Sequence, residues 1–174
     1  MEFIFDTVYN QKAVTTMAKA LRKTLRKKRS RRSHILGWIV VVLALLLTLP
    51  IGGKDFTVDF RTIITWIATF AILIALLFED GINGYIARKR MLVGTGQAIS
   101  IFNEENYCSE SDMGRTEWRY ENIRVLAETK DYFVFLFDMS HAQVYDKNTL
   151  TGGTVDAFRQ FIIDRTGKEM QQIK

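Results

Sequence analysis

The chain has 174 residues, a formal net charge of +5 and one cysteine, Cys108. A single cysteine excludes an intramolecular disulfide and favours the reducing side of a membrane. The positive charge is unevenly distributed: residues 1–33 contain ten Lys or Arg and two acidic residues, whereas residues 91–174 contain nine basic and thirteen acidic residues. This asymmetry excludes a basic globular domain and places the basic character in an N-terminal segment.

Residues 1–33 are predicted to form a short strand and a basic juxtamembrane helix. Residues 2–9 mix aromatic and β-branched side chains with partial alternation, which is typical of a strand. A strand at a terminus needs a pairing partner, and we expect it to join the sheet of the C-terminal domain. From Lys12 onward, apolar residues recur at spacings of three and four, which predicts an amphipathic helix. The pattern allows this helix to continue unbroken into the next segment.

Residues 34–90 are predicted to form a hairpin of two transmembrane helices, at about 34–51 and 62–79. Both segments are apolar and long enough to cross the roughly 30 Å hydrocarbon core of a bilayer. A cleaved signal peptide has only a short basic start, and 33 residues precede the first segment, so we expect it to be retained. The second helix is expected to extend past Phe78 into the cytosol.

The basic residues that flank the two segments predict the orientation of the hairpin. Lys and Arg are abundant before the first segment and again at residues 88–90, whereas the connector at 52–61 has two basic and two acidic residues. Because Lys and Arg favour the cytoplasmic side, we expect both termini in the cytoplasm and a cell-membrane localisation with two spans. Neither span has an ionisable residue at its centre, so the hairpin is expected to be an anchor rather than a transport path.

The basic residues before the first span have three interpretations. Clusters of about 4–8 juxtamembrane basic residues are typical of binding to anionic lipids. A plain topology determinant explains the same residues and is the simpler interpretation. Nucleic-acid binding is disfavoured, because no aromatic residues are interleaved with the charges. The predicted lipid-contact residues are Arg22, Lys23, Arg26, Lys27, Lys28, Arg29, Arg31 and Arg32.

Residues 91–174 are predicted to form a small cytoplasmic domain of strands with one C-terminal helix, which makes the chain an α+β membrane protein. The expected strands are residues 93–102, 107–111, 115–120, 131–138 and 142–145. Because residues 131–138 are apolar on both faces, that strand is expected to be covered on both sides. The helix is expected to start at Val155 after Thr154 or Thr151 as N-cap and to end near Gly167. We expect one curved antiparallel sheet with the helix packed on it.

Several short motifs follow the two apolar segments. They are Trp118-Arg119-Tyr120-Glu121-Asn122-Ile123, Glu128-Thr129-Lys130-Asp131-Tyr132-Phe133 and Val144-Tyr145-Asp146-Lys147, and then a helix with Phe158 and Phe161. This order resembles the YcxB-like family of bacterial membrane proteins, and the resemblance implies a pleckstrin-homology-like (PH-like) cytoplasmic domain. The chain departs from the family at residues 146–148, where only Lys147 matches the frequent Pro-Lys-Arg. The family has no established molecular function, so the resemblance implies none.

The residues show no pattern that predicts an enzyme, a cofactor or a metal site. His34 and His141 are the two histidines, and neither has partners at the spacing of a metal site or a catalytic triad. Residues 94–99 begin like a dinucleotide-binding loop but lack its third glycine. We therefore expect no catalytic residues and no cofactor.

These observations favour a membrane-anchored interaction or scaffold module. The expected partners are the anionic inner leaflet and an unidentified protein, no nucleic acid is expected, and a homo-oligomer is left open. The predicted contact residues of the domain are Arg119, Arg124 and Lys147. Two alternatives are an immunity or stress protein that protects the membrane, and an accessory subunit of a transporter or membrane enzyme.

Overall fold

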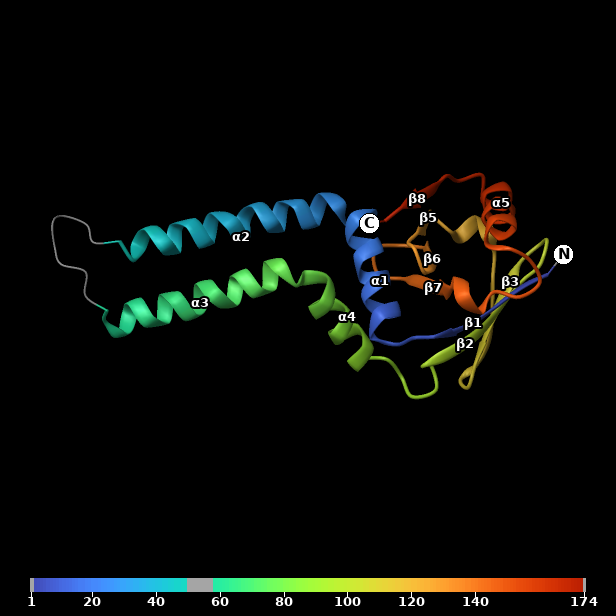
Figure 1. Cartoon of the computed structure of the whole chain (residues 1–174), viewed down its shortest axis with the longest axis horizontal. Helices are drawn as coiled ribbons and strands as arrows, with labels where there is room; N and C mark the ends of the chain where they lie inside the picture. The colour runs from blue at the N-terminus through green and yellow to red at the C-terminus, as the bar shows by residue number, and fades with distance from the viewer. Residues whose placement is uncertain (1, 50–57, 174) are drawn as a thin grey trace.

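The computed structural model describes residues 2–49 and 58–173, in which a long helical hairpin projects from an α+β domain (Figure 1). The helices are α1 (Gln11–Lys23), α2 (Lys27–Leu47), α3 (Phe60–Leu77), α4 (Glu79–Lys89) and α5 (Val155–Thr166). The strands are β1 (Phe3–Val8), β2 (Gln97–Phe102), β3 (Tyr107–Ser111), β4 (Gly114–Trp118), β5 (Val125–Glu128), β6 (Tyr132–Leu136), β7 (Ala142–Asp146) and β8 (Met170–Gln172). Two short 3-10 helices, η1 (Tyr120–Asn122) and η2 (Lys147–Thr149), complete the chain.

Helices α2 and α3 are each long and apolar enough to cross a membrane. Their apolar side chains point outward rather than into a core: Leu36 is 63% exposed and Phe70 is 65% exposed. The two helices pack against each other where Gly37 faces Leu76, since a Cβ on Gly37 would lie 2.7 Å from Leu76 Cδ2. Residues 50–51 of the first predicted span and most of the connector, with Lys54, lie outside the described residues.

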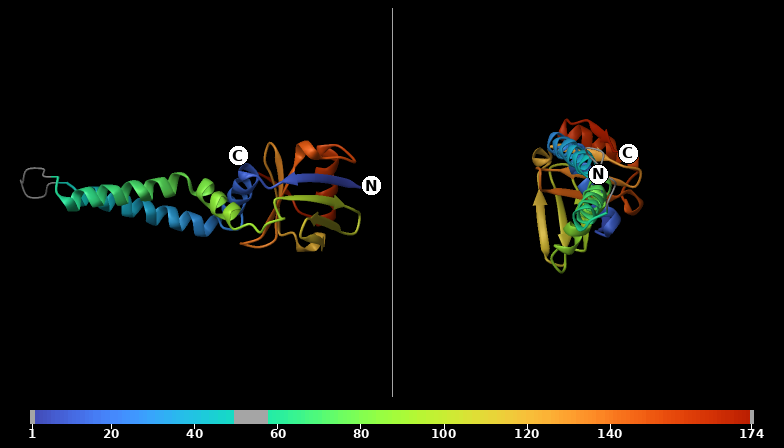
Figure 2. Two further views of the ribbon diagram at one scale, coloured as in Figure 1. Left: turned by 90° about the horizontal axis from the view of Figure 1, so that it is seen from below. Right: turned by 90° about the vertical axis from the view of Figure 1, so that its left-hand side faces the viewer.

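Two breaks divide the helices. The sequence pattern allowed α1 to continue into the first span, but that expectation is wrong, because α1 ends at Lys23 and α2 begins at Lys27. The N–H of Arg26 closes the turn between them by donating to the carbonyl of Leu21 at 2.8 Å. The second break, at Phe78, separates α3 from α4, so the predicted extension of the second helix is present but bent. As a result, α2 and α3 leave one end of the domain together (Figure 2).

Within the described residues the strands form two sheets, not the single antiparallel sheet that was expected. Sheet A has the order β1-β2-β3-β4 and is antiparallel throughout, while sheet B has the order β7-β6-β5-β8 with a parallel β5–β8 pair. The chain passes from sheet A to sheet B through η1, which lies between β4 and β5. Strand β1 joins the sheet as the sequence predicted, with Phe3 opposite Phe102 and Val8 opposite Gln97.

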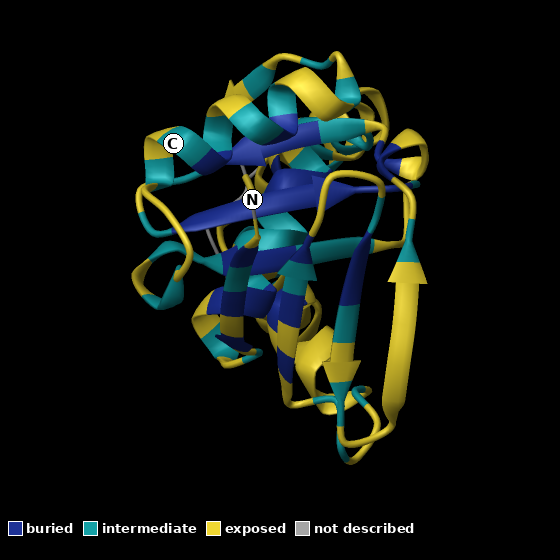
Figure 3. Ribbon diagram, turned by 90° about the vertical axis from the view of Figure 1, so that its right-hand side faces the viewer, coloured by how far each residue is buried: buried dark blue, intermediate teal, exposed yellow. Residues whose placement is uncertain are grey.

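Sheet B is covered on both faces, as the apolar pattern of β6 predicted. Phe133 and Phe135 belong to an aromatic core that includes Phe158 of α5. Val134, on the other face, belongs to a second cluster with Ala13 of α1. Burying both faces of a strand in this way requires apolar side chains at every position. Figure 3 shows the buried interior strands in dark blue and the edge strand β4 in yellow.

Helix α5 begins and ends where the sequence predicted. The hydroxyl of Thr154 accepts a hydrogen bond from the N–H of Ala157 at 3.1 Å, which caps the first turn. Gly167 follows the last turn with a φ of +64°, a conformation that glycine adopts without strain. Between these two ends, α5 packs on the aromatic core that sheets A and B share.

Candidate functional site

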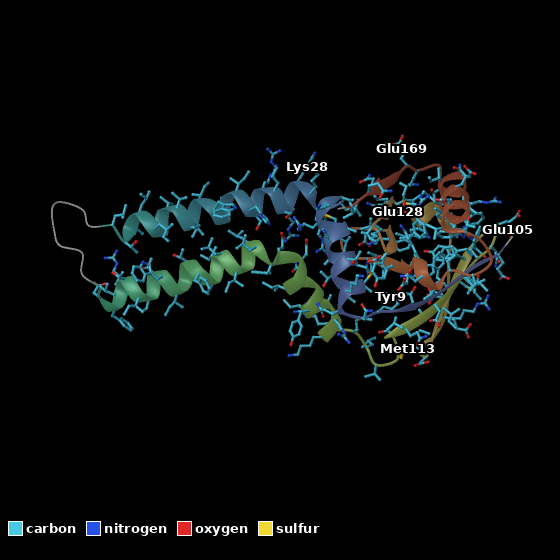
Figure 4. All side chains as sticks on the ribbon, in the orientation of Figure 1. Tyr9, Lys28, Glu105, Met113, Glu128 and Glu169 are labelled. Carbon is cyan, nitrogen blue, oxygen red and sulfur yellow. The ribbon has the colours of Figure 1, made fainter. Side chains whose placement is uncertain are left out.

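The basic segment, residues 22–32, lies at the junction between the hairpin and the β domain. It covers the end of α1, the turn and the first turns of α2, where Figure 4 labels Lys28. Arg22 and Arg26 are half-buried. The exposed members of the segment are Lys23, Lys27, Lys28, Arg29, Arg31 and Arg32. The structure therefore brings the predicted lipid-contact residues together in space, although their role in lipid contact stays a prediction.

The two half-buried arginines form internal contacts. Arg22 donates to both carboxylate oxygens of Asp80, at 2.5 and 2.6 Å, which joins α1 to α4. This hydrogen bonding raises the pKa of the Arg22 guanidinium. Arg26 Nε donates to the backbone carbonyl of Met139 at 2.5 Å and joins the turn to the loop between β6 and β7. Both residues thus fix the hairpin to the domain.

Glu79, the other acidic residue at the start of α4, is also engaged within the junction. His34 Nε2 lies 2.7 Å from its carboxylate, and the Ser30 hydroxyl donates to it at 3.2 Å. Arg22 Nε lies 3.6 Å from the same carboxylate. Two acidic groups at the first turn of a helix suit the positive end of its dipole, so this placement also stabilises the start of α4. Neither carboxylate neutralises the exposed cations of α2.

Five exposed cations at the start of α2 form no ion pair in the described residues of the chain. They are Lys27, Lys28, Arg29, Arg31 and Arg32. The first turn of α2 has no acidic residue, and Arg26 provides no side-chain cap. Positive charges at this end of a helix are repelled by its dipole and by one another. An external anion at this position relieves both effects.

The three predicted contact residues of the β domain do not form one cluster. Arg119 and Arg124 are exposed on either side of η1. The N–H of Arg124 pairs with Leu136 at one end of β6, whereas that of Lys147 pairs with Asp131 at the other end. Because Arg124 and Lys147 lie at opposite ends of the strand, a small ligand does not reach both.

Lys147 is directed inward, to a buried carboxylate that sequence inspection did not single out. Its side chain is 11% exposed, and its ammonium contacts Glu128 and the carbonyl of Thr129. Glu128 also accepts from Arg159 Nη2 at 2.6 Å and from Gln172 Nε2 at 2.9 Å. A sequence signal existed, because Glu128 follows the buried Leu126 at the two-residue spacing of one strand face. A carboxylate at such a position requires buried cationic partners.

The surroundings of Glu128 shift its ionisation strongly. Burial alone raises the pKa of this carboxyl, but hydrogen bonds from Arg159, Lys147 and Gln172 outweigh burial and lower it to about 2. The same hydrogen bonding raises the pKa of Arg159. The group links β5, η2, α5 and β8, and every charged member has a partner of opposite sign. We interpret it as a structural cluster.

Residues 2–49 and 58–173 contain no group of three or more His, Cys, Asp or Glu side chains that could hold a metal ion. Cys108 is buried in β3. Comparison of the chain with protein-family models, with curated proteins and with solved structures gives no match. The function of the basic segment is therefore inferred from its geometry and charge.

Proposed function

We propose that the chain is a membrane-anchored module whose α2–α3 hairpin crosses the cell membrane and whose basic segment binds anionic lipids of the cytoplasmic leaflet. One observation carries this proposal: the cations at the start of α2 that form no ion pair in the described part of the chain directly precede its exposed apolar stretch. That stretch begins immediately after His34 with Ile35 and Leu36, which are 51% and 63% exposed. A basic residue beside an anionic membrane surface contributes about 1 kcal/mol to binding. Both termini and the β domain then lie in the cytoplasm.

We further propose that the domain is PH-like and that the chain is YcxB-like. Two features support this: sheet A and the β5-β6-β7 portion of sheet B are antiparallel meanders, and a helix follows them. Helices α1 to α4 are inserted between β1 and β2, which are nevertheless paired along their full length. The insertion holds the domain close to the membrane. Arg119 and Arg124 remain exposed as candidate contacts for a protein partner.

Lipid quenching of tryptophan fluorescence tests the proposed function. Trp38 lies one turn beyond His34 and is 48% exposed. With Trp66→Phe, it becomes the only tryptophan on the two apolar helices. The full chain is reconstituted into vesicles that contain phosphatidylglycerol and phosphatidylcholine, with one or the other brominated.

Brominated phosphatidylglycerol is expected to quench Trp38 more strongly than an equal fraction of brominated phosphatidylcholine. Replacing the five unpaired cations of α2 with Gln is expected to abolish this preference, and added salt is expected to weaken it. Equal quenching by the two lipids in the chain that retains its cations would contradict the proposal.

A further inference from the structure

A cleft with a volume of about 570 Å³ lies between the start of α2 and strand β8. From α2 it is lined by Lys27, Ser30, Arg31 and His34, and from β8 by Gln171 and Gln172. Spacings of three and four residues place the α2 side chains on one face of the helix. The volume lies in the range of small-molecule sites, about 300–1,000 Å³. A second cleft, of about 310 Å³, includes Arg26 and Arg29 of the basic segment, but it is also lined by the acidic Glu79.

The charged side chains that line this cleft are all basic. Arg22 and Lys23 also line it, and no acidic side chain does so within the described residues. Arg22 is held by Asp80, whereas Lys27 and Arg31 form no ion pair with any residue that the structure describes. Gln171, which also lines the cleft, is exposed. A planar guanidinium group and an ammonium group on one face of a cleft can both donate hydrogen bonds to the oxygens of a phosphate group.

The position of the cleft favours a phosphate that belongs to a lipid. Lys27 and His34 are seven residues apart, which corresponds to about 10 Å along a helix. The polar layer of one leaflet is of similar thickness, about 5–8 Å. Immediately beyond His34, Ile35 and Leu36 expose apolar side chains. A ligand with its phosphate in the cleft therefore has hydrocarbon-compatible surface next to it.

We propose that the α2–β8 cleft is a discrete site for the phosphate headgroup of one anionic glycerophospholipid, with Lys27 and Arg31 as its charged contacts. The proposal rests on the proposed function and adds a single, saturable site to it. Because Gln171 belongs to the β domain and Lys27 to the hairpin, the bound headgroup bridges the two. His34 and Ser30, which also line the cleft, are held in place by Glu79.

Lipid titration monitored by native mass spectrometry tests the site in the full chain. Detergent-solubilised protein is titrated with phosphatidylglycerol, and the first bound lipid is expected to saturate before any further lipid binds. Lys27→Gln with Arg31→Gln is expected to weaken that first step by about tenfold or more. Phosphatidylcholine is expected not to occupy it.

The chain offers a matched control on another face of α2. Lys28→Gln with Arg32→Gln removes the same charges at the same spacing, and neither residue lines the cleft. This variant is expected to weaken the first step by less than about threefold, in accord with a diffuse charge effect. Lys27→Arg with Arg31→Lys is expected to retain the site. Circular dichroism spectra of all variants establish that they fold alike.

The outcomes separate this proposal from the proposed function. If both Gln variants weaken phosphatidylglycerol binding equally, the cleft assignment is overturned while the general attraction to anionic lipids stands. If the unaltered chain does not distinguish the two lipids, the proposed function fails. Glycerol 3-phosphate serves as a water-soluble competitor. If it displaces the lipid at equal concentration, the cleft binds free phosphate compounds, and the lipid assignment is overturned.

Discussion

Gly84 of α4 lies directly against Thr15 of α1. A Cβ on Gly84 would come within 2.4 Å of Thr15 Oγ1 and 2.7 Å of Thr15 Cα, so only glycine fits there. Helix α1 packs its opposite side, through Ala13 and Ala20, onto sheet B. The hairpin is therefore attached to the β domain through α1, which lies between the sheet and α4.

Replacing Gly84 with Ala is expected to destabilise this attachment. The new methyl group meets the backbone of Thr15, which cannot rotate away, and overpacking of this kind costs about 1–3 kcal/mol. Thermal unfolding of the full chain in detergent measures the effect. Gly81→Ala is the control on the same helix, because nothing lies within 4 Å of its added Cβ. That change is expected to be neutral or to stabilise by about 0.5–1 kcal/mol. Equal destabilisation by both changes would refute the close contact.

The Glu128 cluster predicts a dependence of stability on pH. The carboxyl has a pKa of about 2 in the folded chain and an ordinary value of 4.5. As the pH falls, the Glu128 carboxyl is protonated in the unfolded chain at a higher pH than in the folded chain. Its contribution to the free energy of unfolding is therefore complete above about pH 4.5 and is lost as the pH falls toward 2. Its full size is about 3 kcal/mol. Denaturant unfolding between pH 7 and pH 3 measures the slope.

Glu128→Gln is expected to remove that component of the pH dependence and to destabilise the chain at pH 7. Lys147 and Arg159 then lose their shared carboxylate, and breaking a buried ion pair costs about 3–5 kcal/mol. Glu117→Gln makes the same chemical change on an exposed position of β4 and serves as the control. Similar losses from both substitutions at pH 7 would rule out the structural role of the cluster.

Local patterns predicted several elements of the domain, but of the four elements that hold this cluster only α5 was among them. Alternation identified β1, the two-sided pattern of residues 131–138 identified β6 as a covered strand, and Thr154 and Gly167 marked the ends of α5. These features depend on residues close in sequence, so their signals are local. The PH-like fold and the membrane orientation are global properties and stay predictions.

The features that sequence inspection missed depend on contacts between distant segments. Strand β8 is three residues long, two of them Gln, and only its pairing with β5 makes it a strand. The break at Phe78 has no Pro or Gly at that position, so no local signal marks it. The Arg22–Asp80 pair requires α1 and α4 to pack side by side. No short pattern encodes such a relationship.

The N-terminal strand supplies a further prediction, at Gly152. Thr151 pairs with Ile4 of β1, and Gly152 beside it has a φ of +84°. A Cβ on Gly152 would lie 2.0 Å from the carbonyl oxygen of Glu2. Gly152→Ala is therefore expected to loosen β1 as well as to strain the turn, with faster amide hydrogen exchange at Ile4. Gly167→Ala is the control, because it strains a similar backbone but meets nothing within 4 Å, and it is expected to leave exchange in β1 unchanged.

The distribution of Lys and Arg predicts which segments of the chain face the cytoplasm, and cysteine labelling tests it. Cys108 is buried and is the only cysteine, so Cys108→Ser provides a background without reactive thiols. A cysteine at Lys54, in the predicted external connector, is expected to react with a membrane-impermeant maleimide in intact cells. A cysteine at Glu169, which is exposed on the β domain, is expected to react only after lysis. The opposite pattern would place the basic segment outside the cell, away from the anionic inner leaflet, and would remove the electrostatic basis of the lipid site.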